Sequence, residues 1–373
     1  MDARLTSPPV VIAGAGSVGL SCALALARFG VAVRVLDAGS ESRSIDDPRA
    51  IALSHGSRLI LERIGAWSGV VATPIRHIEV SQQGGFGRTR IEASDHGLDA
   101  LGHVVRLGAF NTHLLACARA AGIEVLHDCT VQGFEDGMAL RVRTAAGVEE
   151  AALLVRAEGT PPAGKAEIRD YAQCAIVADV EATGPHGHRA LERFTPEGPL
   201  ALLPLERGYS LVWCASPANA QRRLALDDTA FLAELAHATR FARLAWRATG
   251  ARAAFPLALR RAHEEEDSRV IALGNAAQAL HPVAGQGFNL GLRDAFELAV
   301  HLADGIDATA LAAFRDARKR DRDATIGLTD AYVTVFSNSL APLRVARGLG
   351  LALLDMIPPA RALIARRMMF GMR

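Results

Sequence analysis

The sequence lacks an excess of charge of either sign, and it lacks any long apolar run. Its 373 residues include 41 Lys and Arg against 40 Asp and Glu, a formal net charge of +1. A balanced charge disfavours nucleic acid as a partner. No apolar run approaches the roughly 20 residues that a membrane-spanning helix needs. A neutral small molecule or an apolar partner is therefore the simpler expectation.

Cysteine and histidine are too scattered to form a recognisable framework. The five cysteines have neither metal-ligand nor redox spacing, and their odd number disfavours a disulfide framework, which indicates a reducing cytosol. The twelve histidines include no His-Glu-x-x-His motif, so we predict no metal site. The first residues lack a basic stretch followed by an apolar one. We therefore expect a cytoplasmic protein without a signal peptide.

What the sequence does contain begins with a glycine pattern near its start. "VVIAGAGSVGLSCALALARFGVAVRVLD" reads as a strand, a G-x-G-x-x-G turn formed by Gly14, Gly16 and Gly19, a helix, and a second strand that ends in Asp37. Gly14 permits the tight turn, Gly16 allows close approach of a pyrophosphate, and Gly19 allows close packing of helix on strand. The helix start offers N–H groups to phosphates, and Asp37 would accept hydrogen bonds from ribose hydroxyls. This context predicts a dinucleotide site, which NAD and FAD share.

A second turn rich in small residues lies far along the chain, in "ALGNAAQALHPVAGQGFNLGLRDAFELA" at 272–299. An apolar strand precedes it, and an amphipathic helix begins near Phe288. A simple NAD dehydrogenase does not need such a second turn. A long dinucleotide that lies across the sheet does, so the pair of turns favours FAD.

Here the sequence resembles a known family, the aromatic-hydroxylase flavoprotein monooxygenases with a para-hydroxybenzoate hydroxylase-like fold. "GNAAQALHPVAGQGFNLGLRD" is similar to the second FAD motif of that family, and the segments 47–67 and 100–118 resemble two further family segments. "RFTPEGPLALLPL" (193–205) and "FSNSLAPLRVARGLGLALLDMIPP" (336–359) are similar to the ubiquinone-biosynthesis hydroxylase branch, closest to its 2-polyprenyl-6-methoxyphenol hydroxylase type.

The resemblance implies roles for individual residues. Asn275 stands where the family contacts the flavin ribitol, and Arg49 and Arg106 match family arginines near the cofactor. His281 is a candidate base or hydrogen-bond partner for the substrate, although a purely structural histidine is an equal alternative. The residues expected to line the isoalloxazine ring are Pro282, Gly285, Gln286, Gly287 and Asn289.

One position departs from the family pattern. Glu158 stands where the family has an Asp that begins its middle motif, and the Ser and Arg that usually follow are absent from "LLVRAEGTPPAGKAEIRDYAQ". In the family this motif lies near the flavin pyrophosphate and the path of the nicotinamide cofactor. A loop deletion that leaves function intact is the simpler interpretation, because loops tolerate changes in length.

The activity implied by the resemblance is hydroxylation of a polyprenylated phenol in ubiquinone biosynthesis. NAD(P)H would reduce FAD, molecular oxygen would give a flavin hydroperoxide, and the phenol would attack its terminal oxygen. Two alternatives stay open from the sequence. One is a non-catalytic flavoprotein subunit that organises a biosynthetic complex, and the other is an FAD-linked dehydrogenase.

The length of the chain and its strand patterns predict two domains and a helical end. We expect an α/β fold in which a Rossmann-like FAD-binding domain carries an inserted substrate domain built on an antiparallel sheet. The FAD-binding domain is predicted over 1–72, 104–170 and 263–330, and the substrate domain over 73–103 and 171–262. A helix is predicted over 221–247, and the charge runs 260–267 and 314–324 are predicted to be solvated.

The carboxyl-terminal segment 331–373 is predicted to form amphipathic helices that are broken at Pro358 and Pro359. From Leu343 onwards it carries six arginines against one acid, with leucines between them. Segment 343–373 would dock on an anionic membrane, at the inner face of the cytoplasmic membrane, or on a partner of a biosynthetic complex. Packing on the protein's own surface is an equal alternative.

Overall fold

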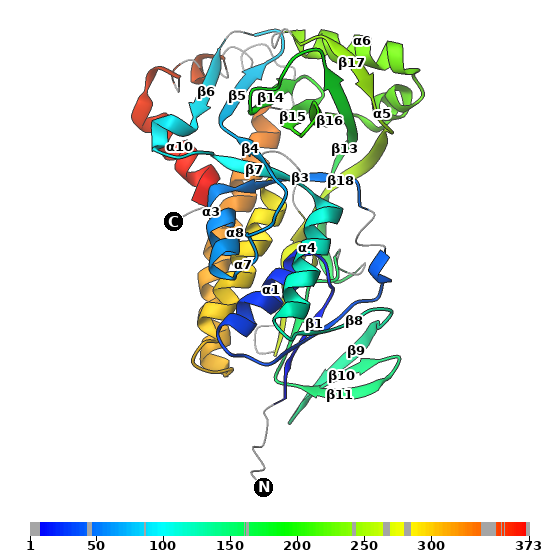
Figure 1. Cartoon of the computed structure of the whole chain (residues 1–373), viewed down its shortest axis with the longest axis vertical. Coiled ribbons are helices and arrows are strands. Elements are labelled where there is room, and N and C mark those ends of the chain that lie inside the picture. Colours follow the sequence, from blue (N-terminus) through cyan, green and yellow to red (C-terminus); the bar gives the residue numbers. More distant parts are fainter. Residues whose placement is uncertain are drawn as a thin grey trace.

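The molecule consists of two large sheets joined by a smaller one, with helices on the outside (Figure 1). The computed structural model describes residues 8–42, 47–85, 87–159, 161, 164–240, 244–263, 269–279, 285–336, 348–351, 353 and 355–370. The predictions made for His281 and Pro282 lie outside these residues.

The lower sheet in Figure 1 is the Rossmann-like sheet that the glycine pattern predicts. Its strand order is β19-β12-β1-β2-β8, and all four neighbouring pairs are parallel. The turn from Gly14 to Gly16 follows β1 directly, at the carboxyl edge of this sheet. The strands are β1 (Val10–Ala13), β2 (Val33–Leu36), β8 (Glu124–Leu126), β12 (Leu153–Arg156) and β19 (Val270–Ala272).

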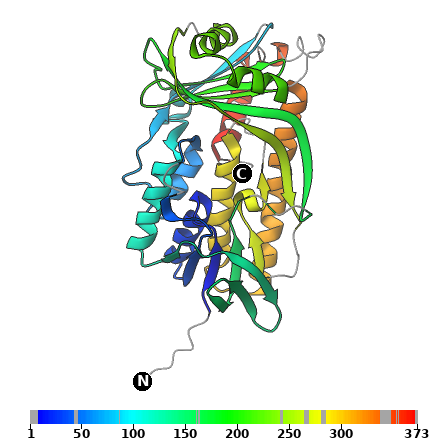
Figure 2. The same cartoon turned by 90° about the vertical axis from the view of Figure 1, so that its right-hand side faces the viewer.

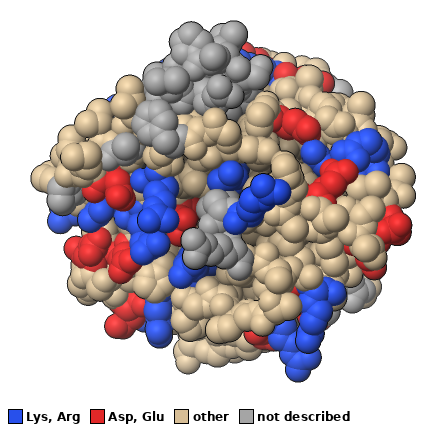
Figure 3. All heavy atoms as spheres, turned by 90° about the horizontal axis from the view of Figure 1, so that it is seen from above, with Lys and Arg blue, Asp and Glu red and all other residues tan. Residues whose placement is uncertain are grey.

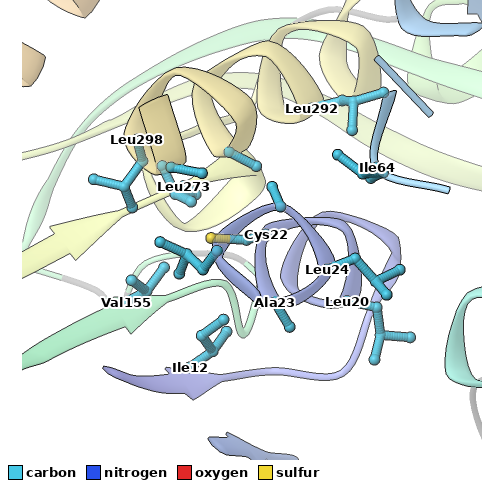
Figure 4. Packing of buried hydrophobic residues seen from close by; sticks show 14 of the residues in the cluster. Ile12, Leu20, Cys22, Ala23, Leu24, Ile64, Val155, Leu273, Leu292 and Leu298 are labelled. Atoms are coloured by element: carbon cyan, nitrogen blue, oxygen red, sulfur yellow. The ribbon is translucent and has the colours of Figure 1, made fainter. Parts of the chain in front are cut away.

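Helices cover one face of this sheet, and a small antiparallel sheet covers the other. On the helical face lie α1 (Ser17–Arg28), α4 (Leu107–Ala120) and α7 (Gln286–His301). Figure 4 shows α1 between the sheet residues Ile12 and Val155 on one side and α7, with Leu292 and Leu298, on the other. The opposite face packs against the sheet formed by β9 (Val131–Asp136), β10 (Leu140–Thr144) and β11 (Gly147–Ala151).

The upper sheet is mixed rather than purely antiparallel, which corrects one detail of the predicted substrate domain. Within the described residues it has nine strands in the order β20-β18-β13-β16-β15-β14-β5-β6, and β17 pairs with β13. The pair β14–β5 is parallel. A parallel pair needs a long connection, which the chain between residues 82 and 189 supplies. The strands are β5 (His77–Gln82), β6 (Arg88–Glu92), β13 (Ala166–Ala182), β14 (Arg189–Thr195), β15 (Gly198–Pro204), β16 (Tyr209–Ala215), β17 (Trp246–Thr249), β18 (Ala253–Ala262) and β20 (Gln278–Ala279).

One face of the upper sheet is covered by α5 (Pro217–Leu224) and α6 (Asp228–Ala238). The single helix predicted over 221–247 is therefore wrong in its extent. The first helix ends at Leu224, and Asp227 begins the second, because its carboxylate accepts a hydrogen bond from the Ala230 amide (2.8 Å) as an N-cap. Figure 2 shows both helices above the sheet and the long strands β13 and β18 running down beside the lower part of the molecule.

A three-stranded antiparallel sheet joins the two large ones. It is formed by β3 (Ala50–Ser54), β7 (Gly102–Arg106) and β4 (Thr73–Ile75). Leu53 and Val105 pack into the helical core of the lower part, whereas Val104 packs with Ala190 of the upper sheet. The predicted domain boundaries at 72/73 and 103/104 fall at or inside these strands, and they stay predictions.

The charge run 314–324 is not solvated as a whole, contrary to the sequence prediction. It lies in α8 (Ala308–Phe336), where Arg318 and Arg322 are only 4% and 7% exposed. Both guanidinium groups face Asp294 of α7, which is fully buried; Arg318 lies 2.5 Å and Arg322 3.7 Å from its carboxylate. The acid that compensates these two cations is 24 and 28 residues away, so the local sequence pattern could not reveal the burial.

The carboxyl-terminal helix α10 (Pro358–Phe370) packs on the protein's own surface. Ala365 and Met369 are buried against residues of β6 and of the 3₁₀ helix η1 (Ala93–His96). The predicted break is present, because helical residues 355 and 356 are followed by a new helix that starts at Pro358. Leu363, on the other side of α10, is 55% exposed. Among the described residues, no helix combines the length and apolar character that crossing a bilayer requires.

Candidate cofactor and substrate site

The first glycine turn is shaped by the chain around it. Gly14 has a φ of +109°, and a Cβ there would lie 2.6 Å from the carbonyl oxygen of Ala157. A Cβ at Gly19 would collide with the carbonyl oxygen of Gly14. A Cβ at Gly16, by contrast, would meet no atom within 4 Å. Gly14 and Gly19 are thus required by the fold itself, whereas Gly16 borders open space at the start of α1.

That open space suits the diphosphate of a dinucleotide. Gly16 is the N-cap of α1 and supplies no side-chain cap, so the first N–H groups of the helix point toward the space that Gly16 leaves. Asp37 stands beside it, since its carboxylate accepts hydrogen bonds from the amides of Ala15 (2.5 Å) and Gly39 (2.8 Å). A carboxylate has about four acceptor positions, so the half-buried Asp37 can also accept from ribose hydroxyls.

The second glycine turn opens α7. Gly285 is the N-cap of this helix in the left-handed conformation, with a φ of +60°, and Gln286 is the first helical residue. A Cβ at Gly287 would meet no atom within 4 Å, so the first turn of α7 also borders open space. Asn275 is exposed and lies in the 3₁₀ helix η3 (Gly274–Ala276), just beyond the carboxyl end of β19. The carboxyl edge of a parallel sheet is where such folds bind ligands.

The side chain of Asn289 fixes this second turn. It is 2% exposed, and its Oδ1 accepts hydrogen bonds from the Ser54 amide (2.8 Å) and the Ser57 hydroxyl (2.6 Å). Its Nδ2 donates to the carbonyls of Ala52 (2.9 Å) and Gly285 (2.8 Å). All four hydrogen bonds that an amide can make are therefore made within the protein. Asn289 ties the start of α7 to β3, and its predicted contact with the flavin remains a prediction.

The two turns, which are about 270 residues apart in the sequence, lie close to each other in the fold. Val18, in the first turn of α1, fits against Gly274 and Gly291. A Cβ on either glycine would lie 3.0 Å or less from the Val18 side chain. Sequence reasoning missed Gly274 and Gly291, because their need for a missing side chain arises only where α1 and α7 meet.

The two predicted cofactor arginines have different surroundings. Arg49 is paired with Asp47, at 2.6 Å, and this hydrogen-bonded contact raises the pKa of the guanidinium. Arg106, at the start of α4, donates to the Pro48 carbonyl (3.1 Å) and lies 2.6 Å from the carboxylate of Asp179 on β13. The Arg106 side chain is 42% exposed and that of Asp179 is 45% exposed. Because exposed ion pairs contribute only about 0–1 kcal/mol, Arg106 can exchange Asp179 for a ligand at little cost.

Glu158, the departure from the family pattern, lies next to the first glycine turn. It follows the carboxyl end of β12, and its Cα is one of the atoms that a side chain at Gly14 would strike. Its carboxylate pairs with Arg156 of the same strand at 2.7 Å. Glu158 therefore stands beside the first glycine turn, while its carboxylate is held by Arg156 of β12.

The upper sheet turns an open, mainly apolar face away from α5 and α6. Strand register places one row of side chains across five strands of this face. Every side chain in this row is half-buried. The residues before and after each of them in the strand point to the covered face, and most of these are buried. The row contains a single carboxylate. Its members are Val177, Val212, Ala201, Glu192 and Val80.

This open face reaches the predicted ring-binding end of the cofactor site. A cavity of about 70 Å³ is lined by Ile78 and Ile91 of the open face, by Ala52 of β3, and by Gln286 and Asn289 of α7. An apolar wall beside a helix start can hold an aromatic ring and keep water away from it. Sequence reasoning placed these strands in a substrate domain but could not say which alternate residues face the cleft.

The ion pairs behind α7 support the segment that leads to the second turn. Gln278 of β20 donates a hydrogen bond to the buried Asp294 (3.3 Å), which also accepts from Arg318 of α8. Burial lowers the pKa of the neighbouring Arg322 to about 10. The described residues contain no group of three or more His, Cys, Asp or Glu side chains that could hold a metal ion.

Comparison with known proteins agrees with this geometry. The family model described as an FAD binding domain matches residues 7–327. The ubiquinone hydroxylase UbiL of Rhodospirillum rubrum is 34% identical over 391 residues, covering 96% of this chain and 89% of that protein. The 3-demethoxyubiquinol 3-hydroxylase of Escherichia coli is 30% identical over 377 residues, covering 93% and 95%.

Among solved structures, the p-nitrophenol 4-monooxygenase PnpA of Pseudomonas putida superposes with a TM-score of 0.80. It is 20% identical, and the match covers 98% of this chain and 99% of that one, so it shows the common fold. The chain therefore belongs to the FAD-binding monooxygenases, in the branch that contains these ubiquinone hydroxylases, and it is an FAD-dependent monooxygenase.

Proposed function

We propose that this monooxygenase hydroxylates the aromatic ring of a polyprenylated phenol, of the 2-polyprenyl-6-methoxyphenol type, in ubiquinone biosynthesis. Molecular oxygen is the co-substrate, and NAD(P)H, typical of the family, is the reductant. The observation that carries the proposal is the open apolar wall of the upper sheet beside the first turn of α7. The names of the two relatives, both hydroxylases of ubiquinone or a ubiquinol, support the substrate class.

The residues of the chain bind and orient in this proposal, because bound FAD supplies the oxygen chemistry. Gly16, Asp37 and the start of α1 hold the diphosphate and ribose, and Arg106 moves from Asp179 to the cofactor. The positive end of the α7 dipole, at Gln286 and Gly287, favours negative charge on the flavin ring. Val177, Val212 and the other apolar members of the wall exclude water from the substrate ring.

Further contacts to the bound ligands are proposed from the family motif. Asn275 would reach the ribitol, and Pro282 and Gly285 would line the flavin ring through their backbone. His281 would accept the proton of the phenol or hydrogen-bond its oxygen, since an imidazole titrates near neutral pH. His281 and Pro282 lie outside the described residues.

We also propose that the carboxyl-terminal segment touches the cytoplasmic face of the membrane, where a polyprenylated phenol would be dissolved. Leu353, Met356 and Ile357 are 54%, 76% and 46% exposed, and Arg366 and Arg367 are exposed on the neighbouring helix. Apolar side chains beside arginines suit the interface of an anionic bilayer. On the face drawn in Figure 3, acids and bases are interspersed among mostly uncharged residues. Co-sedimentation with anionic but not neutral vesicles is the expected result.

Anaerobic mixing with NADPH tests the activity directly. The flavin absorbance of the FAD-loaded protein should bleach, and a phenolic substrate should accelerate the bleaching. A strain that lacks the protein should accumulate a polyprenyl-methoxyphenol. Loss of quinone without a defined intermediate, together with a flavin that NADPH does not reduce, would contradict the proposal and favour an organising role.

A further inference from the structure

The small cavity beside the start of α7 has an apolar outer wall. Leu101, Ala365 and Met369, which belong to the loop before β7 and to α10, form part of its lining. Met369 is 4% exposed and Ala365 is 1% exposed, so both side chains are part of the interior. A substrate ring in the cleft would therefore have the inner side of α10 next to it.

A larger groove lies directly on the other side of Met369. It measures about 740 Å³, which is within the range of roughly 300–1,000 Å³ that ligand pockets occupy. It runs between α3 (His55–Arg63), η1, α7 and α10. Its apolar lining consists of Leu59, Ile60, Leu98, Phe296, Ala362, Met369 and Phe370. Its charged lining, which includes Arg63, Asp95 and Glu297, contains both signs and so does not select an anion or a cation.

The cavity and the groove adjoin each other. Ser54 and Met369 line both of them, so the side chain of Met369 separates one from the other. Methionine is unbranched and adapts its shape easily, which suits a residue at such a boundary. Apolar residues thus line the space on either side of Met369, and a passage from the cleft to the groove under α10 requires only that this side chain moves.

The walls of the groove are fixed in place. Arg361 of α10 lies 3.3 Å from the carboxylate of Asp95 in η1. At the other end, α10 crosses the start of α3 closely, because a Cβ at Gly56 would lie 2.7 Å from the Met369 carbonyl oxygen. The groove is therefore formed before any ligand arrives.

We infer that this groove binds the isoprenoid chain of the phenolic substrate while the ring lies in the cleft beside α7. The inference rests on the proposed function, since it requires a phenol that carries a hydrocarbon chain. A flexible chain makes no hydrogen bonds, so its binding depends on the apolar area that it removes from water. The apolar lining of the groove offers such area. A hydrocarbon chain has no polar group, so it needs no partner among the charged residues of the groove.

Binding of phenols with zero, one and two isoprene units to the FAD-loaded protein tests the inference. For the unmodified protein, the Kd measured from the flavin absorbance should fall at least about threefold with each added unit. Leu59→Arg places a charge in the groove at a residue that is 37% exposed. We expect this variant to bind the chainless phenol normally and to lose most of the dependence on chain length. Ala362→Trp, which fills the groove, should do the same.

Val148→Arg is the matched control, because it also puts a charge on an exposed apolar residue, 61% exposed, on β11 far from the groove. It should keep the chain-length dependence of the unmodified protein. The inference would be overturned if both Leu59→Arg and Ala362→Trp kept the dependence of Kd on chain length. It would also be overturned if the unmodified protein hydroxylated the chainless phenol and its Kd did not change with chain length. If no phenol of any length binds or is hydroxylated, the proposed function fails and the inference falls with it.

Discussion

The two faces of the upper sheet are made by alternate residues of the same strands, yet they differ in how completely their side chains are buried. On the covered face, Leu211 of β16 is fully buried under α5 and α6 with Leu202 and Ile176. On the open face, the next residue, Val212, is only half-buried and stands in the row that ends at Val80. Both faces are apolar, so composition alone would not distinguish a core from a binding wall.

The difference shows where the sheet carries stability and where it carries function. Close packing on the covered face means that removed atoms leave a cavity, which is costly. Half-buried apolar residues on the open face have already been left partly without packing partners, and a ligand can supply the missing contacts. The small joining sheet also has one packed face and one face toward a cavity. On the packed face, the ring centroids of His103 and Trp67 are 5.0 Å apart. On the other face, Ala52 lines the cavity beside α7.

The largest expected effect is on the covered face. Leu211→Ala should lower the free energy of unfolding by about 2–5 kcal/mol, because it opens a cavity in a fully packed cluster. Urea unfolding of the FAD-loaded protein measures this change. Val212→Ala is the matched control and should cost about 1 kcal/mol or less. Equal losses at the two positions would remove the distinction between the faces.

The next effect concerns the back of the joining sheet and depends on pH. Burial lowers the pKa of His103 from 6.5 to about 4. The unfolded chain takes up this proton below pH 6.5 and the folded one only near pH 4, so stability falls as pH decreases between these values. Between pH 7 and pH 5 the loss should be about 2 kcal/mol. His103→Gln should lose less stability over the same interval, and an identical pH dependence in both proteins would contradict a buried neutral histidine.

Substitutions on the open face are expected to have the smallest effect on stability, although they should clearly affect activity. Val212→Ala should raise the KM for a phenolic substrate by up to about tenfold, because two methyl groups of the wall are worth roughly 0.8 kcal/mol each. More NAD(P)H should also be consumed for each product formed, since water reaches the site more easily. Product and NAD(P)H measured in one assay test both. An unchanged KM with unchanged coupling would place the substrate elsewhere.

Sequence reasoning was most successful where a motif carries its own context. Gly14, Gly16 and Gly19 follow a strand and precede a helix, and the predicted parallel sheet and family are confirmed. Their conformational needs are local, because a tight turn and a close helix crossing act within a few residues. The FAD-dependent monooxygenase activity was predictable from the resemblance of several segments to one family, and the family match confirms it.

Features that depend on distant partners were not predictable. The hydrogen bonds of Asn289 reach Ser54 and Ser57, more than 230 residues earlier. The burial of Arg318 depends on Asp294 in another helix. The parallel pairing of β14 with β5 depends on how the chain returns after a long excursion through the lower part of the molecule. In each case the decisive contact is created by the fold and has no local signature.

The contact of Val18 with Gly274 and Gly291 has a consequence for cofactor choice. The contact sets the distance between the starts of α1 and α7. The two turns at these helix starts are expected to bind opposite ends of one dinucleotide, so this distance must match the length of the cofactor. A methyl group on either glycine would push the two helix starts apart. Enlarging either glycine would therefore alter the distance at which the two turns hold the ends of a bound dinucleotide.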